Sequence, residues 1–329
     1  MLNALVCIDI SSKIGTGHFR RMRHLSKAMK KKSVLFTYLI FGIDNQNNNI
    51  FNEVNTIFIA NGQKFFEYIE RNLRNFDLLI FDFLKYPDLY FNNMKKQINI
   101  DKPIIAFYEY ENFDYSADLV INYNLFNGWR DYDEKKVLAG PKYTIFNENI
   151  IDYKQNYNYY YNYNYNNNNN NNVFVSFGGS DPSNFTHQFL ELIATKNLKF
   201  NYNILIGAMH YGDLLNYEKY NNIKIYKGDV NIFSLMTQCS LCITAGGNTM
   251  YEATYLGLPT CVLAHNEHQH TFAKNLQKDF LQTYVGMGSD VNWSKVMNFI
   301  STEHKTYKND IIDNLGVTRI TQRILEVLS

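Results

Sequence analysis

Short apolar runs alternate with helix-length segments along most of the chain. The runs are apolar on both faces and comprise residues 4–10, 33–40, 55–60, 78–83, 103–108, 118–123, 173–177, 203–207, 241–245 and 260–264. Strands of a parallel sheet that helices cover on both sides have this pattern. It predicts an α/β protein with two doubly wound, Rossmann-like domains facing a central cleft. Ligands of such sheets bind beyond the carboxyl ends of the strands, so the loops after the strands are the candidate sites.

A tract of Asn and Tyr interrupts this rhythm between residues 152 and 172. It has almost no aliphatic side chains, so it cannot offset the entropy of being ordered, and we interpret it as a linker. The predicted domains are therefore residues 1–151, with the N-terminal glycine loop, and residues 173–329, with two more glycine loops. A chain of 329 residues suits two domains of about 150 residues each.

Composition narrows the class of ligand. The formal net charge is +1 and 19% of the residues are charged, so no strong basic field favours nucleic acid or an anionic membrane. A small polar ligand fits better. The N-terminus lacks the order of a signal peptide, and no stretch offers about 18 uninterrupted apolar residues, so we expect a cytosolic protein without stable membrane insertion.

The cysteines and a histidine-rich segment are the residues that could bind a metal. Cys7, Cys239, Cys242 and Cys261 lie in or beside apolar runs, which favours buried, reduced thiols. The segment "HNEHQH" at residues 265–270 lacks the H-E-x-x-H spacing of a zinc site. We interpret it as a solvated loop and expect neither a metal nor a cofactor.

The segment "SFGGSDPSNF" is the first candidate phosphate loop of the C-terminal half. Gly178 and Gly179 follow a strand, Asp181 is a candidate helix cap, and Pro182 suits the first helical position. Two glycines allow backbone N–H groups to approach an anion at the positive end of a helix. A tight turn that merely uses glycine is the alternative for this loop alone.

The segment "ITAGGNTMYEATYLGLP" repeats that plan. Gly246 and Gly247 follow a strand, and a helix begins at Asn248 or Thr249 and ends near Gly257. Glu252 lies about one turn into this helix, where it either contacts ribose hydroxyls or complements the helix N-terminus. Together the two loops predict a site for a nucleotide diphosphate, and the absence of G-x-x-x-x-G-K-[ST] disfavours a P-loop NTPase.

The segment "IGTGHFRR" forms a third glycine loop near the N-terminus. It fails as a dinucleotide fingerprint because Arg20 stands at the third glycine position. Gly15 and Gly17 instead place His18 at the entrance of a helix, where an imidazole can accept a proton near neutral pH. A histidine that caps or packs locally is the alternative. The arginines Arg20, Arg21 and Arg23 are expected on a solvated helix face.

Several segments, in order, resemble the UDP-sugar hydrolases of pseudaminic acid biosynthesis, which are related to GT-B glycosyltransferases of the MurG type. They are "IGTGHFRRMRHLSKAM", "FDLLIFD", "ADLVINYN", "AGPKYTIF", "SFGGSDPSN", "GDVNIFSLMTQCSLCITAGGNTMYEATYLGLP", the glutamine of "NEHQH" and "DNLGVTRI". The resemblance implies a GT-B-like fold and a cytosolic, metal-independent enzyme. It would cleave a UDP-linked 2,4-diacetamido-2,4,6-trideoxyhexose with inversion, releasing the sugar and UDP.

The resemblance also implies roles for particular residues. His18 matches the base that activates water. The matches to the UDP-binding positions are Gly178, Gly179, Ser180, Gly246, Gly247, Asn248, Thr249, Glu252 and Gln269, and the further expected substrate-binding residues are Gly15, Gly17, Arg21, Asp82 and Asn122.

The sequence departs from that family where the sugar would bind. Phe83 and Leu84 follow Asp82 where relatives usually have His and Tyr, and Phe146 and Asn147 stand where an arginine is often found. Two alternatives therefore remain open. One is a GT-B glycosyltransferase with a UDP-sugar donor, and the other is a non-catalytic module that binds a sugar nucleotide.

Overall fold

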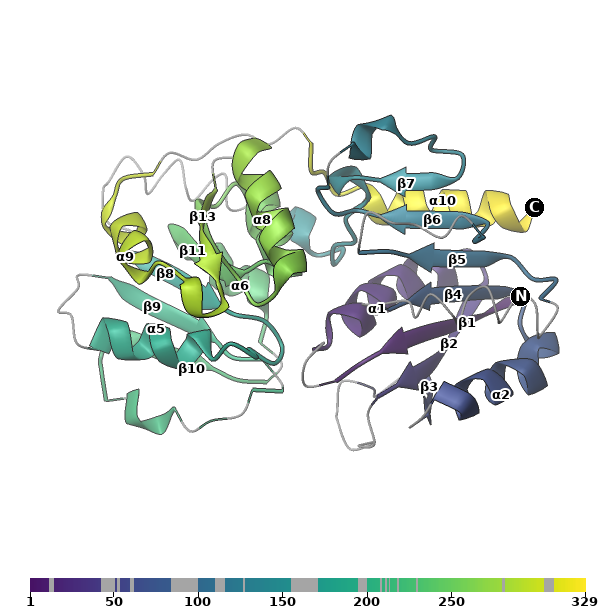
Figure 1. Cartoon of the computed structure of the whole chain (residues 1–329), viewed down its shortest axis with the longest axis horizontal. Coiled ribbons are helices and arrows are strands. Elements are labelled where there is room, and N and C mark those ends of the chain that lie inside the picture. The colour runs from purple at the N-terminus through teal and green to yellow at the C-terminus, as the bar shows by residue number, and fades with distance from the viewer. Residues whose placement is uncertain are drawn as a thin grey trace. The chain divides into compact units, whose positions relative to one another are not determined.

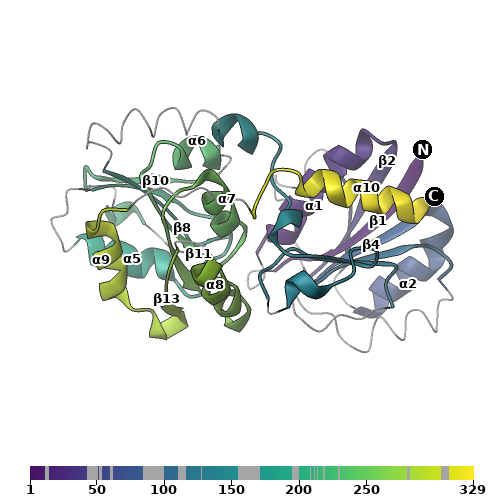
Figure 2. The same ribbon diagram turned by 90° about the horizontal axis from the view of Figure 1, so that it is seen from above.

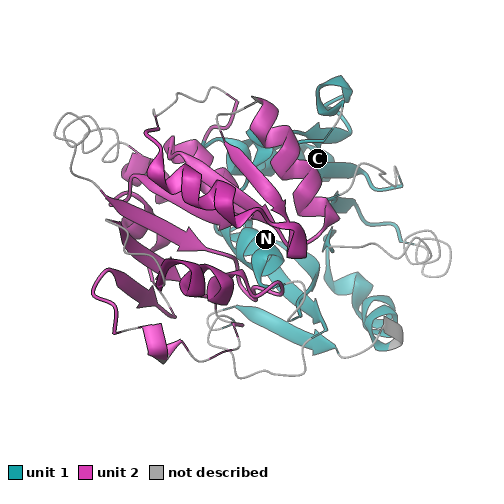
Figure 3. Ribbon diagram, turned by 60° about the vertical axis from the view of Figure 1, so that its left-hand side comes forward, with its two compact units in different colours: residues 1–146, 314–329 teal, residues 147–313 magenta. Residues whose placement is uncertain are grey.

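The computed structural model forms two compact units, residues 1–146 with 314–329 and residues 147–313 (Figure 3). It describes residues 1–11, 15–42, 51, 54–59, 62–83, 100–109, 116–126, 128–154, 171–194, 200–207, 209–210, 212, 214–217, 219–228, 230–279, 282–304 and 311–329. Leu84 and residues 155–170 of the predicted linker lie outside these ranges.

Unit 1 contains a parallel sheet of 7 strands in the order β3-β2-β1-β4-β5-β6-β7 (Figure 1). The strands are β1 (Leu2–Asp9), β2 (Val34–Phe41), β3 (Asn55–Ile59), β4 (Leu78–Asp82), β5 (Ile104–Phe107), β6 (Leu119–Asn122) and β7 (Val137–Ala139). The helices are α1 (Gly17–Lys30), α2 (Gly62–Asn72) and α10 (Gly316–Leu328), with short 3-10 turns at η2 (Leu73–Asn75), η3 (Trp129–Asp131) and η4 (Pro141–Tyr143).

Helices cover both faces of this sheet because its strands are apolar on both sides. On one face, Leu5 and Cys7 of β1 pack in a core with Phe65 and Ile69 of α2. Successive side chains of a strand point to opposite faces, so the buried Val6 of β1 faces the other way, on the side of the sheet where α1 packs.

Unit 2 contains a parallel sheet of 6 strands in the order β10-β9-β8-β11-β12-β13. The strands are β8 (Asn172–Ser176), β9 (Asn201–Leu205), β10 (Ile223–Tyr226), β11 (Leu241–Ala245), β12 (Thr260–Ala264) and β13 (Thr283–Met287). The helices are α5 (Phe185–Ala194), α6 (Ile232–Met236), α7 (Asn248–Leu256), α8 (Glu267–Asp279) and α9 (Trp293–Ser301), with 3-10 turns at η5 (Leu215–Tyr217) and η6 (Gly288–Asp290).

The ten apolar runs each contain a strand, which confirms the predicted architecture of two parallel α/β sheets. The strands β7, β10 and β13 were not predicted. Each is an edge strand, with a neighbouring strand on one side only. Such strands can be shorter and more polar than central strands, so their sequence pattern is weaker. The alternation of Lys224 with two isoleucines in β10 shows how polar such a strand can be.

The predicted C-terminal domain is wrong at its end, because residues 314–329 belong to unit 1. Helix α10 packs against α1 and η4, and Figure 2 shows it beside α1. Ile320 and Ile324 of α10 are fully buried, and Arg319 Nη1 donates to the Lys142 carbonyl at 2.8 Å. The amphipathic helix therefore completes the cover of the first sheet.

The ends of the predicted linker also differ from the prediction. Residues 150–154 are helical, and Asn172 is the first residue of β8. Tyr153 accepts a hydrogen bond from Asn231 Nδ2 at 2.7 Å, and Lys154 Nζ lies 3.9 Å from the centre of the Tyr255 ring. These contacts fix the first residues of the tract to unit 2.

Among the helices that the structure describes, none is both long enough and apolar enough to cross a bilayer.

The position of α10 predicts that its core face stabilises unit 1. Ile324→Ala should lower the free energy of unfolding of unit 1 by about 2–5 kcal/mol, because it leaves a cavity where a fully buried side chain was removed. Native-state hydrogen exchange should then show faster exchange for amides of β1 and β4 and unchanged exchange for β8 and β11. The exposed Gln322→Ala on the same helix is the control. Loss of protection in β8 and β11 instead would assign α10 to the other unit.

Candidate active site

Two side chains of α1 define the candidate site in unit 1. His18 is the second residue of the helix, as expected, and Arg21 lies on the same face three residues later. The expectation of a solvated arginine face holds for Arg20, which is exposed, but is wrong for Arg21, whose exposed fraction is 3%. Arg21 is buried because its face of α1 packs against the carboxylates of Asp82 and Glu109, at and just after the carboxyl ends of two strands.

The carboxylate of Asp82 binds both of these side chains. Asp82 ends β4 and has no exposed surface. Arg21 Nε donates to Oδ2 at 2.6 Å, and Arg21 Nη2 donates to Oδ1. His18 Nδ1 lies 2.8 Å from Oδ1 and 3.1 Å from the Asp82 backbone carbonyl. Arg21 Nη2, which can only donate, also lies 3.0 Å from Nδ1. Because the shorter contact of Nδ1 is with a carboxylate oxygen and a carbonyl oxygen lies beside it, we assign the hydrogen to Nδ1, which leaves Nε2 to accept a proton.

The electrostatics of this cluster favour its charged forms. Burial raises the pKa of Asp82, but Arg21 and His18 outweigh it and hold that pKa at about 2. Burial lowers the pKa of His18, and so does the charge of Arg21, but the charge and hydrogen bond of Asp82 together with the charge of Glu109 outweigh them, so the pKa lies above the ordinary 6.5. Asp82 is therefore ionised at neutral pH, and His18 holds a proton more strongly than a free imidazole does.

Three further polar side chains reach the cluster from neighbouring strands. Arg21 Nη1 donates to Glu109 Oε1 at 2.7 Å and to the Tyr123 hydroxyl at 2.6 Å, and Asp9 Oδ1 lies 3.9 Å from His18 Nδ1. The sequence interpretation missed all three. The available signal was their common place at or just after the carboxyl ends of β1, β5 and β6, which are close to the end of β4 in the sheet.

The other predicted residues of unit 1 have different surroundings. Gly15 adopts a φ of 80°, which favours glycine, and an added Cβ on Gly17 would meet nothing within 4 Å. Asn122 is fully buried at the end of β6, where its Oδ1 accepts from the Asn124 N–H at 3.0 Å. The ring of Phe83 lies 5.8 Å from that of Phe65 in the core, as a packing residue.

In unit 2, the first glycine loop follows β8. Gly178 has a φ of 90°, which supports the predicted turn. The helix begins later than predicted, at Phe185, so Pro182 is not its first residue. Asp181 does cap the helix, because its carboxylate accepts from the Phe185 and Thr186 N–H groups at 2.9 and 2.7 Å. That buried carboxylate already satisfies the amides that an anion would use at this helix end.

The second glycine loop follows β11 and leads directly into α7. Gly247 is the N-cap residue of α7 without a capping side chain, the first turn has no acidic residue, and an added Cβ on Gly247 would meet nothing within 4 Å. Asn248 and Thr249 begin α7, as predicted, and the helix ends at Gly257 with a φ of 82°. The first N–H groups of a helix lack partners within it, so this end suits an anion.

The loop after β12 joins the second glycine loop. A Cβ on Gly246 would lie 2.9 Å from Gln269 Cβ, so the two residues pack closely, and Gln269 Oε1 accepts from the His265 N–H at 2.9 Å. Ser180 of the first loop and Glu252 of α7 are both half-buried. The strands β8, β11 and β12 are adjacent and parallel, so the loops at their carboxyl ends bring the predicted residues of unit 2 to the same end of the sheet.

The segment "HNEHQH" is not the predicted solvated loop, because α8 begins at Glu267. His268 is buried against Phe272, with ring centres 4.1 Å apart. The His265 side chain stacks on Phe185 with ring centres 4.7 Å apart, and burial lowers its pKa. These rings are packing residues of unit 2.

The four cysteines are free and buried, and their burial confirms that part of the prediction. Over the described ranges, no group of three or more His, Cys, Asp and Glu side chains has the arrangement of a metal site.

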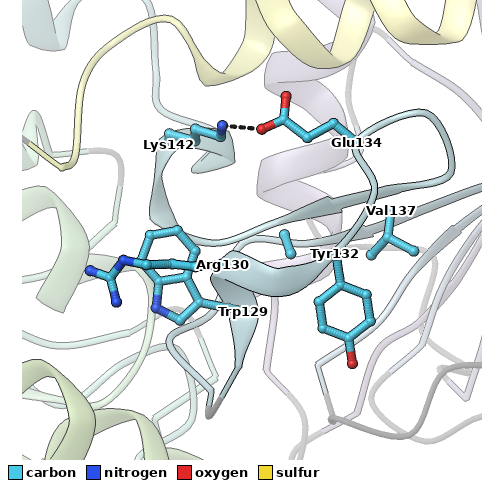
Figure 4. Close-up of a pocket in the computed structure, with 7 residues that line it drawn as sticks. Trp129, Arg130, Tyr132, Glu134, Val137 and Lys142 are labelled. Atoms are coloured by element: carbon cyan, nitrogen blue, oxygen red, sulfur yellow. Dashed lines mark hydrogen bonds and ion pairs between the residues drawn. The ribbon is translucent and has the colours of Figure 1, made fainter.

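A pocket of about 130 Å³ lies elsewhere in unit 1, beside β7 (Figure 4). The Arg130 guanidinium stacks 4.1 Å from the Trp129 ring centre, and Lys142 pairs with Glu134. The pocket is lined by Trp129, Arg130, Tyr132, Glu134, Val137, Ala139 and Lys142. None of them belongs to the predicted site, so the His18 cluster is the better candidate on chemical grounds.

Two curated proteins resemble the chain along most of its length. An uncharacterized protein of Methanocaldococcus jannaschii is 30% identical over 318 residues, and the match covers 91% of this chain but 62% of that protein. The spore coat polysaccharide biosynthesis protein SpsG of Bacillus subtilis is 25% identical over 334 residues, with 93% of each chain covered.

Solved structures resemble the fold at low sequence identity. MurG of Acinetobacter baumannii has a TM-score of 0.57 at 12% identity, with 99% of each chain covered. The UDP-GlcNAc 2-epimerase of Neisseria meningitidis, bound to UDP-GlcNAc, has a TM-score of 0.56 at 12% identity and the same coverage. At such identity the likeness shows the fold alone, and it confirms the GT-B-like prediction.

A family model described as a protein of unknown function, DUF354, matches residues 146–316, which is just over half of the chain. The match includes all the strands of unit 2, both of its glycine loops and the start of α10. The chain therefore belongs to the DUF354 family.

Proposed function

We propose that the chain hydrolyses a UDP-linked amino-deoxy sugar of the 2,4-diacetamido-2,4,6-trideoxyhexose type to free sugar and UDP, with inversion at the anomeric carbon. The observation that carries the proposal is the oriented imidazole of His18, whose Nδ1 donates to the buried Asp82. A carboxylate that fixes one nitrogen of a histidine leaves the other as a proton acceptor, as in general-base catalysis. The similarity to SpsG, a polysaccharide biosynthesis protein, is consistent with sugar-nucleotide chemistry.

In this proposal His18 Nε2 takes a proton from water as the water oxygen attacks the anomeric carbon. An O–H bond of water breaks, an N–H bond forms at Nε2, and a new C–O bond forms at the sugar. The bond from the anomeric carbon to the UDP oxygen breaks, and UDP leaves with that electron pair. A base positioned in this way contributes about 10²- to 10⁴-fold to the rate.

Unit 2 holds the nucleotide in the same proposal. The N-terminus of α7 at Gly247, Asn248 and Thr249, which no side chain caps, binds the pyrophosphate, and Glu252 one turn later binds the ribose. Amides directed at the leaving phosphate also stabilise the charge that grows there during cleavage. The α5 end is a weaker anion site because Asp181 occupies its amides.

The sugar-binding residues differ from those that the resemblance implies. Phe83 packs in the core and offers no polar atom to a sugar. Glu109 and Tyr123 place a carboxylate and a hydroxyl beside the His18 cluster instead. In this proposal Glu109 and Tyr123 are the side chains of unit 1 that contact the sugar.

Incubation with a panel of UDP-amino-sugars tests the reaction. We expect UDP and free sugar by mass spectrometry without any acceptor, and a sugar product with the anomeric configuration opposite to that of the substrate. Release of UDP only after an alcohol acceptor is added would identify a glycosyltransferase. Binding of UDP-sugars without turnover across the panel would identify a non-catalytic module.

His18→Asn tests the base. The amide can still donate to Asp82, but it cannot take a proton, so turnover should fall by about 10²- to 10⁴-fold. UDP affinity, measured by calorimetry, should be unchanged because the nucleotide binds to unit 2. His24→Asn, on the same helix, is the control and should keep its turnover. Turnover of His18→Asn close to that of the unsubstituted protein removes His18 from the base role.

Gly247→Ala tests the pyrophosphate site. Its φ of −114° suits alanine, and the added methyl group meets no protein atom within 4 Å, so the melting temperature should hardly change. The methyl group would occupy the space that the phosphate needs, and UDP affinity should fall at least about tenfold, or about 1.4 kcal/mol. Unchanged affinity in calorimetry would place the pyrophosphate elsewhere.

A further inference from the structure

The imidazole of His18 lies between two carboxylates. Its Nδ1 is 2.8 Å from Asp82 Oδ1, and its Nε2, the nitrogen that the reaction uses, is 3.7 Å from Glu109 Oε1. Asp82 is fully buried, whereas the side chain of Glu109 keeps 14% of its surface exposed. Glu109 is therefore the carboxylate that combines contact with the reactive nitrogen and access to solvent.

Arg21 holds both carboxylates in place. Its Nε donates to Asp82 Oδ2 at 2.6 Å, and its Nη1 donates to Glu109 Oε1 at 2.7 Å. The same Nη1 reaches the Tyr123 hydroxyl, and Arg21 lies 5.4 Å from the centre of that ring. A guanidinium presents its donors in a rigid plane, so this arrangement fixes the distance between the carboxylates on either side of the imidazole.

The charges around the imidazole favour a proton on it. The charged groups that face it are Asp9 from β1, Arg21 from α1, Asp82 from β4 and Glu109 after β5. Tyr123 faces the same cluster, and burial raises its pKa, so it stays neutral. Three carboxyl groups and one guanidinium therefore surround the imidazole, and a proton on the ring is favoured by the negative charge of Asp82 and of Glu109.

We propose that Glu109 is a positioning residue for His18. The Glu109 carboxylate, held by Arg21, stabilises the proton that His18 Nε2 takes from water. This inference rests on the proposed function for the identity of the reaction, but the pairing itself is a property of unit 1. The pairing with Glu109 makes His18 a stronger base, so Nε2 loses its proton only at a higher pH. Hydrolysis should therefore rise as the pH passes upward through the pKa of His18.

Glu109→Gln tests the pairing, because the amide oxygen still accepts from Arg21 Nη1 while the negative charge is lost. The readout is the pKa of His18, followed by NMR in protein with ¹⁵N-labelled histidine and assigned by the signal missing from His18→Asn. We expect a value above 6.5 in the unsubstituted protein and a fall of about one pH unit in Glu109→Gln. The acid limb of the turnover profile should move to lower pH by the same amount, and the alkaline plateau should fall.

Two further variants serve as controls. Glu67→Gln removes the same charge from the surface of α2, where it pairs with Arg71, and should leave the His18 pKa unchanged. Glu109→Asp keeps the charge and should restore most of the pKa and of the pH profile.

The outcomes separate this inference from the proposed function. An unchanged His18 pKa in Glu109→Gln overturns the role of Glu109, even in an active hydrolase. A lowered pKa in Glu109→Gln together with no turnover of any UDP-sugar supports the pairing and overturns the hydrolase.

Discussion

The candidate site depends on one buried carboxylate. Asp82 lies at the end of a central strand, and its burial is tolerable because Arg21 binds both of its oxygens and His18 binds one of them. A buried ion without such partners costs several kcal/mol. The same contacts orient the imidazole and fix Arg21, which in turn fixes Glu109. The contacts of Asp82 therefore both stabilise the packing of this cluster and orient His18 for proton transfer.

The two units use helix ends differently. In unit 2, the carboxylate of Asp181 caps the N-terminus of α5, whereas no side chain caps α7 at Gly247. A phosphate competes poorly with a carboxylate that is already part of the fold, so the N-terminus of α7 is the more suitable anion site. In unit 1 the N-terminus of α1 also lacks a capping side chain, and its first turn carries His18. The division suggests nucleotide binding in one unit and proton chemistry in the other.

The sequence predicted the parts that follow from local pattern. Ten apolar runs became strands, and the segment after Gly17 became a helix, because burial on both faces restricts composition strongly. The edge strands β7, β10 and β13 and the packing of α10 in unit 1 were missed, since the local sequence pattern does not show which element a segment packs against. Arg21 was expected in solvent because its burial depends on Asp82, 61 residues away in the chain. Glu109 was missed for the same reason, as only the order of the strands brings it to His18.

The tautomer of His18 tests the central claim most directly. In protein with ¹⁵N-labelled histidine, long-range ¹H–¹⁵N spectra across the imidazole titration distinguish the two ring nitrogens. We predict that Nδ1 keeps its proton above the pKa, held by Asp82, and that Nε2 alone becomes deprotonated. Loss of the proton from Nδ1, with Nε2 still protonated, would contradict the claim that Asp82 prepares this histidine to act as a base.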